Sequence, residues 1–174
     1  MALYLIELTP ATASKDEATA LIETVSNSLS EGAELIETQV SADHKLIFAI
    51  IESENTAFAP ALTAAIGERA SVVGPDEVRL VGAELDDIKK LKKDADYLVE
   101  WDIPAEITME QYLTRKKANA PKYAEVPEVS FLRTYVREDT AKCLCFYDAP
   151  DEDAVVRARK AVSTPIDRLF KLHA

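Results

Sequence analysis

The stretch FLRTYVREDTAKCLCFYDAP, residues 131–150, has a counterpart in LIETQVSADHKLIFAIIESE, residues 35–54. In each stretch, two runs of apolar and β-branched residues flank a short polar turn that contains Asp43 or Asp139. Such runs on both sides of a turn predict two paired strands. The two stretches lie 96 positions apart without an insertion, which indicates an internal repeat. This repeat decides the fold.

Outward from this pair, the two halves predict the same order of strand, helix, strand, strand, helix, strand. LYLIE at residues 3–7 resembles DYLVE at residues 96–100, and both predict a first strand. The first helices open at two capping boxes, Ser14–Glu17 and Thr108–Gln111. Asn55 and Asp151 are good N-caps for the second helices. The last strands are expected at residues 77–81 and 167–172.

The order βαββαβ is that of the ferredoxin-like unit. The predicted fold class is therefore α+β, with tandem ferredoxin-like repeats at residues 1–82 and 96–174 and a charged, helix-prone linker at residues 83–95. Helices cover one face of each sheet, so the other face must be buried in another way. We expect the two sheets to pack together, as in a dimeric α/β barrel fused into one chain, because each unit alone would be only marginally stable.

Composition excludes several classes of function. The formal net charge of −11 disfavours nucleic-acid binding through a basic face. The chain has no stretch of about 20 apolar residues that could span a membrane, and its N-terminus lacks the basic segment of a signal peptide. Two cysteines are too few for a disulfide framework. We expect a reduced, soluble, cytoplasmic protein whose partner is a small molecule or a metal ion, with a homo-oligomer as a further possibility.

Strand alternation groups the candidate site residues. On the second hairpin, Cys143, Cys145 and Tyr147 share one face, and Arg133 and Tyr135 share a face of the preceding strand. We predict that these faces, being more polar than their opposite sides, line the space between the two sheets. Glu100 on the first strand is expected to join them in one cavity. The predicted ligand-binding residues are Glu7, Glu100, Arg133, Tyr135 and Tyr147.

The first half lacks most of this chemistry. Ile47, Ala49 and Ile51 stand where the second half has Cys143, Cys145 and Tyr147. Glu7 alone keeps its counterpart, which is Glu100.

Two cysteines on one strand face can give two thiolates to a soft or borderline metal ion. Cys143, Cys145 and Glu100 are the predicted metal ligands, and His44 or His173 could complete the set. A different interpretation is that both cysteines are small buried apolar side chains. A redox or nucleophilic role is a third. The charged run Arg157–Lys160 is interpreted as a solvated helix face.

The second half resembles a family of small ferredoxin-like proteins of uncertain function that are described as nickel-binding. Four elements carry the resemblance, which spans residues 96–172: Val99-Glu100, Thr134-Tyr135-Val136 with Asp139, CFYDAP at 145–150 and TPIDRL at 164–169. The resemblance implies a divalent metal such as nickel as cofactor. Ala158 occupies the position where the family commonly has a His in its second helix, which weakens that implication.

Three functions follow from these observations. The first is a small protein that binds a divalent metal or a small ligand between the two sheets. The second is a cofactor-independent enzyme of the dimeric α/β-barrel type, in which the Tyr, Arg, Glu and Cys side chains would act as acid, base or nucleophile. The third is a non-catalytic interaction module with a filled interior.

Overall fold

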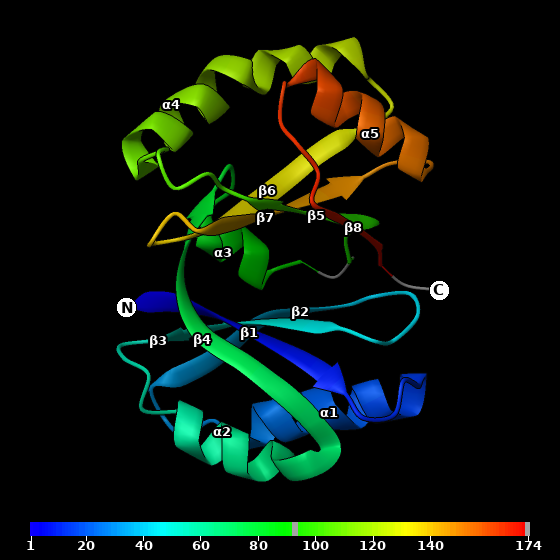
Figure 1. Ribbon diagram of the computed structural model, residues 1–174. Helices are drawn as coiled ribbons and strands as arrows, with labels where there is room; N and C mark the ends of the chain where they lie inside the picture. Colours follow the sequence, from blue (N-terminus) through cyan, green and yellow to red (C-terminus); the bar gives the residue numbers. More distant parts are fainter. Residues whose placement is uncertain (92–93, 173–174) are drawn as a thin grey trace. The chain divides into compact units, whose positions relative to one another are not determined.

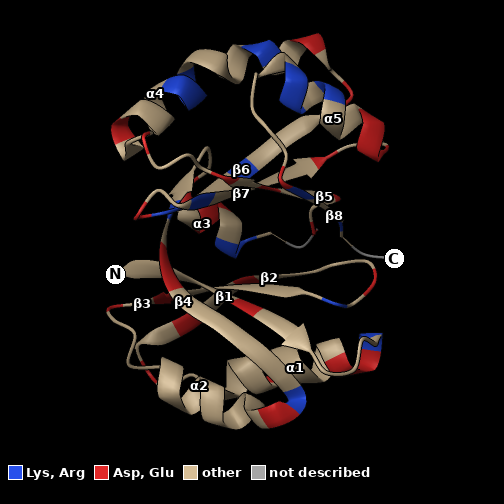
Figure 2. Cartoon of the chain, in the orientation of Figure 1, with Lys and Arg blue, Asp and Glu red and all other residues tan. Residues whose placement is uncertain are grey.

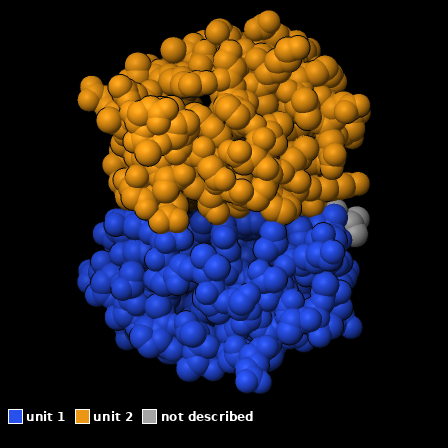
Figure 3. All heavy atoms as spheres, viewed as in Figure 1, with its two compact units in different colours: residues 1–78, 85–92, 173–174 blue, residues 79–84, 93–172 orange. Residues whose placement is uncertain are grey.

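The computed structural model describes residues 1–91 and 94–172 and divides the chain into two compact units. Unit 1 contains residues 1–78 and 85–91, and unit 2 contains residues 79–84 and 94–172 (Figure 3). Residues 92–93 of the predicted linker and the candidate ligand His173 lie outside the described residues.

Unit 1 has the predicted order of strands and helices. Its elements are β1 (Ala2–Pro10), α1 (Lys15–Ser28), β2 (Ala33–Val40), β3 (Ile47–Ser53), α2 (Ala59–Ile66), a 3₁₀ turn (Gly67–Arg69) and β4 (Ala70–Val81), whose last three residues belong to unit 2. The short helix α3 (Leu85–Lys89) follows β4. The spatial strand order is β2-β3-β1-β4, with antiparallel pairing throughout.

Unit 2 repeats this plan. Its elements are β5 (Tyr97–Asp102), α4 (Met109–Asn119), the 3₁₀ helix η2 (Ala120–Glu125), β6 (Ser130–Arg137), β7 (Lys142–Asp148), α5 (Glu152–Ala161) and β8 (Arg168–Lys171). The strand order β6-β7-β5-β8 matches that of unit 1, element for element. In unit 1, α1 and α2 cover one face of the sheet, and in unit 2, α4 and α5 do the same (Figure 1). The predicted tandem ferredoxin-like fold is confirmed.

Local chemistry explains where three of the helices begin. The Ser14 side chain accepts a hydrogen bond from the Glu17 backbone N–H at the start of α1. Thr108 and Gln111 form a complete capping box at the start of α4. Asp151 caps α5 by accepting from the Ala154 N–H at 2.8 Å. These caps confirm the predicted helix starts.

The predicted N-cap at Asn55 is wrong. The helix α2 begins at Ala59, and Asn55 instead accepts a hydrogen bond from the Ala57 N–H at 2.9 Å within the preceding turn. Pro60 explains the later start, because its missing N–H costs nothing in the first turn of a helix.

Each unit has its own apolar core between its sheet and its helices. In unit 1, alternate residues of β1 and β3 pack against Leu21 and Val25 of α1. In unit 2, alternate residues of β5 and β7 pack against Tyr112 of α4 and Ala158 of α5. Among the described residues, no helix is long and apolar enough to cross a membrane.

Candidate functional site

The face of β7 that carries both cysteines lies under the helices. Cys143, Cys145 and Tyr147 are buried in the same cluster as Tyr112 of α4 and Ala158 of α5. The prediction that this face lies opposite the helices is therefore wrong. Its pairing with β5 is the reason, because the partners across from these residues are the large apolar side chains Trp101, Val99 and Tyr97.

Arg133 and Tyr135 lie on the opposite face of the sheet. The Arg133 guanidinium lies over the ring of Phe146, 5.0 Å from its centroid, and Tyr135 meets the same ring edge-on at 6.0 Å. A bulge between Phe131 and Arg133 changes the alternation, so that Phe131 pairs with Tyr147 on the helix side. Strand alternation alone could not reveal this shift.

Glu100 also lies on the face opposite the helices, since it pairs with Leu144 and not with a cysteine. Its carboxylate accepts from Lys142 at 3.4 Å and from Arg168, so it is satisfied at the edge formed with β8. Glu7 occupies the equivalent position in unit 1, next to Phe48. The predicted site residues therefore do not meet in one cavity, and the predicted ligands Cys143, Cys145 and Glu100 lie on two faces of the sheet.

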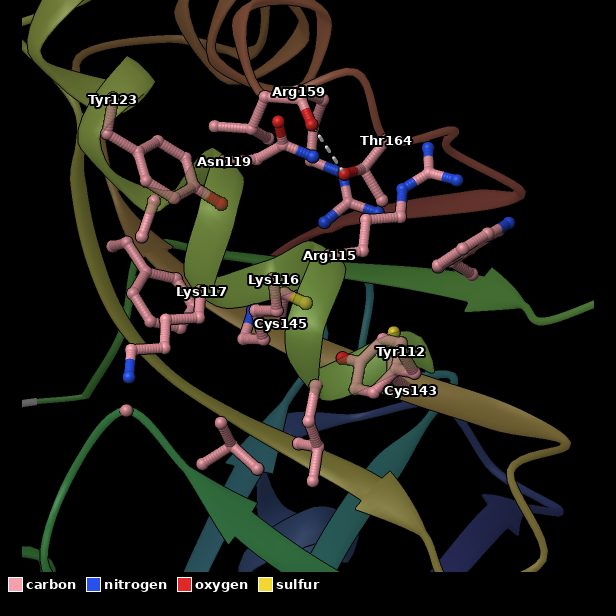
Figure 4. Close-up of a pocket in the computed structure, with 17 residues that line it drawn as sticks. Tyr112, Arg115, Lys116, Lys117, Asn119, Tyr123, Cys143, Cys145, Arg159 and Thr164 are labelled. Atoms are coloured by element: carbon pink, nitrogen blue, oxygen red, sulfur yellow. Dashed lines mark hydrogen bonds between the residues drawn. The ribbon is translucent and has the colours of Figure 1, made fainter. Parts of the chain in front are cut away.

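The side chains that do converge surround a pocket of about 200 Å³ inside unit 2 (Figure 4). The pocket lies between the helix-covered face of the sheet and the segments α4, η2 and α5. Its lining contains both cysteines and a group of aromatic and basic side chains: Trp101, Tyr112, Arg115, Lys116, Lys117, Tyr123, Phe131 and Arg159.

Aromatic rings form one wall of the pocket. Tyr123 of η2 stacks on Phe131 of β6, with ring centroids 5.5 Å apart and an interplanar angle of 7°. The hydroxyl oxygens of Tyr123 and Tyr147 lie 2.6 Å apart and share a hydrogen bond. Burial raises the pKa of Tyr123 to about 12 and that of Tyr147 above its ordinary value, so both phenols stay neutral at physiological pH.

Arg159 of α5 is the buried cation of the pocket, with 2% of its surface exposed. Its Nη1 donates to the Tyr147 hydroxyl at 3.1 Å, and its Nη2 donates to the Pro165 carbonyl at 2.6 Å. Within the described part of the chain, its Nε has no hydrogen-bond partner. Burial lowers the pKa of Arg159, but the charge of Cys145 and the hydrogen bond to Tyr147 outweigh burial and hold this pKa above its ordinary value. The guanidinium is therefore charged, buried and incompletely satisfied.

Three more basic side chains reach the pocket from α4, which shows blue patches in Figure 2. The Lys116 Nζ lies 4.3 Å from the centroid of the Phe131 ring, and the Arg115 guanidinium lies 5.4 Å from that of the Trp101 ring. Lys117 is the third. No Asp or Glu is among the lining residues that the structure describes. The electrostatic character of the pocket is therefore opposite to that of the whole chain.

The two cysteines differ in their surroundings. The Cys145 sulfur accepts a hydrogen bond from the Thr134 hydroxyl at 3.2 Å. A second hydrogen bond, from the Cys143 thiol, and the nearby charges of Lys116 and Arg159 hold the pKa of Cys145 well below its ordinary value. The same bond to Cys145, together with burial, raises the pKa of Cys143. Both cysteines are free, and Cys145 is the one that favours the thiolate.

Several of these residues were missing from the predicted site. The sequence places Arg159 in a charged run that is typical of a solvated helix face, yet it is buried. The sequence does contain a pattern that indicates burial of Arg159, because this residue continues the apolar stripe of Ala154, Val155 and Ala158 on α5. Tyr112 and Tyr123 gave no such signal, since tyrosines on helical segments are most often plain core residues.

Residues 97–172 match the family described as nickel responsive protein SCO4226-like. The predicted family resemblance of the second half is confirmed. SCO4226 of Streptomyces coelicolor A3(2) is 17% identical and aligns with 44% of this chain and 94% of its own, with a TM-score of 0.38. No curated protein matches the chain.

Two solved structures are similar over almost the whole chain. A chlorite dismutase-like protein, TA0507, is 15% identical, with a TM-score of 0.59 and coverage of 100% of this chain and 96% of its own. A monooxygenase-like protein, FN1347 of Fusobacterium nucleatum, is 13% identical, with a TM-score of 0.55 and coverage of 98% and 90%. At such identities the likeness shows the fold alone, which is that of the dimeric α/β-barrel proteins.

Proposed function

We propose that this protein binds a small organic molecule in the pocket of unit 2. The observation that carries the proposal is a preformed pocket of about 200 Å³ whose wall combines stacked aromatic rings, two free cysteines and a buried arginine. An apolar cavity of about 150 Å³ can hold benzene, whereas drug-sized ligands occupy roughly 300 Å³ or more. The pocket therefore suits a molecule with a single ring.

This proposal moves the ligand from the space between the two sheets, where the sequence predicts it, to the region under the helices of unit 2. The reason is that the cysteines and Tyr147 face those helices.

The repeat supports a site in unit 2. At the equivalent positions of unit 1, Ile47, Ala49 and Ile51 are buried in an apolar core with Leu21 and Val25. These side chains offer no hydrogen-bonding or nucleophilic group. Because the backbone plan is shared, the cysteines and Tyr147 are not needed to build the fold, and a function in binding accounts for them better.

The single tryptophan of the chain offers a direct test. Trp101 lines the pocket, so titration with single-ring probe compounds should change its fluorescence in a saturable way. Ala120→Leu adds bulk at the exposed rim of the pocket and should weaken binding at least about tenfold, as a blocked apolar site loses roughly 1–3 kcal/mol. Ala118→Leu is the matched control, because Ala118 is exposed two positions earlier, on α4, but does not line the pocket. Equal affinities in both variants would contradict the proposed site.

The family description names nickel, but the pocket residues do not fit a metal centre. Among residues 1–91 and 94–172, no group of three His, Cys, Asp or Glu side chains could hold a metal ion. Glu100 lies across the sheet from the two cysteines. The cations Lys116 and Arg159 beside Cys145 would also repel a divalent ion.

A small-molecule enzyme is the second candidate. One observation favours it: the Cys145 sulfur accepts two hydrogen bonds and lies near two cationic side chains. Proteins activate nucleophilic cysteines with such surroundings, because they stabilise the thiolate. The similarity to the monooxygenase-like and chlorite dismutase-like proteins does not support this candidate, because their sequence identity to this chain is too low to indicate a shared activity. The reactivity of Cys145 tests it.

A further inference from the structure

We propose that the ligand of this pocket is a small carboxylate with one ring, and that Arg159 receives its carboxylate. This inference rests on the proposed binding function and names the chemical class of the ligand. It depends on the charge balance of the pocket, the state of Arg159 and the shape of the wall.

The charge balance is the first observation. Four cations line the pocket, namely Arg115, Lys116, Lys117 and Arg159. None of them forms an ion pair within the described residues, although ion pairs are common elsewhere in this part of the chain. The Cys145 thiolate could supply one negative charge, which leaves three cations without a counterion. In a chain with a net charge of −11, such a concentration of unpaired cations is unexpected unless an anion enters.

The state of Arg159 is the second observation. Its known partners, the Tyr147 hydroxyl and the Pro165 carbonyl, are both neutral. Burying the charge of Arg159 is costly, and a buried donor without an acceptor adds to that cost. A carboxylate oxygen near the Nε would offset both. The two bonds from Nη1 and Nη2 hold the guanidinium in place, so the ligand finds an ordered partner.

The shape and composition of the pocket wall indicate the rest of the ligand, which is the part other than the carboxylate. The stacked pair Tyr123–Phe131 and the ring of Trp101 present apolar surface to the pocket. Aromatic rings pack well against such surfaces, in offset or edge-on geometry. With a volume of about 200 Å³, there is room for one ring and a carboxylate, but not for a nucleotide or a fused polycyclic ligand.

Benzoate and its neutral analogue benzamide have nearly the same shape. A difference between their affinities therefore reports the effect of the ligand's charge and not of its size. Titration of the full chain, followed by Trp101 fluorescence and calorimetry, should give an affinity for benzoate about tenfold or more above that for benzamide. The preference should fall as salt rises, because salt screens the attraction of the partly exposed cations. Arg159→Gln should abolish it, whereas Lys160→Gln, an exposed neighbour on α5 outside the pocket, should leave it unchanged.

Lys116→Gln provides a second variant in case Arg159→Gln does not fold, since Lys116 lies at the half-buried rim. It should reduce the preference for benzoate. If benzoate and benzamide bind equally, or if neither salt nor Lys116→Gln changes their ratio, the carboxylate proposal is overturned while the small-molecule function stands. If neither compound nor any other single-ring probe binds, the proposed function itself fails.

Discussion

The Arg159 Nη1 donates a hydrogen bond to the Tyr147 hydroxyl across 3.1 Å, and the same oxygen lies 2.6 Å from that of Tyr123. This short chain of polar groups joins α5, β7 and η2 around the pocket. In unit 1, the position of Tyr147 is taken by Ile51, so no such chain can form there. The polar chain therefore distinguishes unit 2 from unit 1.

Tyr147→Phe should destabilise the protein by about 1–3 kcal/mol, because it leaves the buried Arg159 Nη1 without its acceptor. Tyr123→Phe should cost less, about 1 kcal/mol, since it leaves the Arg159–Tyr147 bond in place and Tyr123 is half-buried. Urea denaturation of both variants measures the difference. Equal losses would show that the Arg159–Tyr147 bond contributes little.

Gly82→Ala should destabilise unit 2 and disturb the pocket. Gly82 has φ +87°, and a Cβ there would lie 2.7 Å from the Phe131 ring. Gly32→Ala is the matched control, because Gly32 has φ +95° but nothing within 4 Å of an added Cβ. The control should lose about 1–2 kcal/mol from backbone strain alone. Gly82→Ala should lose more and should also weaken probe binding, which thermal denaturation and Trp101 fluorescence would show.

The fold could be predicted because its signals are local and occur twice. The capping residues Ser14 and Thr108 mark equivalent helix starts, and the constant spacing of the two hairpins fixes the repeat. Neither signal depends on which face of a sheet is buried.

The site could not be predicted, because the orientation of β7 is ambiguous in sequence. Cys143 and Cys145 on one face are as apolar as Leu144 and Phe146 on the other, so alternation does not say which face meets the helices. The bulge before Arg133 moves Phe131 to the helix side, whereas Arg133 and Tyr135 lie on the predicted face, opposite the helices. Arg159 was not predicted as a site residue for a different reason, since an arginine in a charged run is exposed in most helices.

Cys145 should react with iodoacetamide at a rate that changes little between pH 8.5 and pH 7. Its pKa is lowered, so the thiolate persists below the range in which an ordinary thiol is protonated; a thiol of pKa about 8.5 would lose more than about tenfold in rate over this interval. Mass spectrometry of the alkylated chain should locate the label on Cys145. Cys143→Ala should restore a steeper dependence on pH, because it removes the main hydrogen bond to the Cys145 sulfur.

Benzoate should slow the alkylation of Cys145 if both share the pocket. A pH profile identical to that of free cysteine, in the wild type and in Cys143→Ala alike, would contradict an activated thiolate and remove the support for the enzyme candidate.

Nickel should not bind through the two cysteines. Untagged protein dialysed against Ni²⁺ and then against buffer should retain the same nickel content as Cys143→Ser, Cys145→Ser and Glu100→Gln, because these three side chains lie on two faces of one sheet and cannot share an ion. Elemental mass spectrometry gives the content per chain. His173→Gln extends the test to the predicted ligand outside the described residues. One nickel per chain that is lost in both cysteine variants would reinstate the metal site and would place the cations Lys116 and Arg159 in a role other than anion binding.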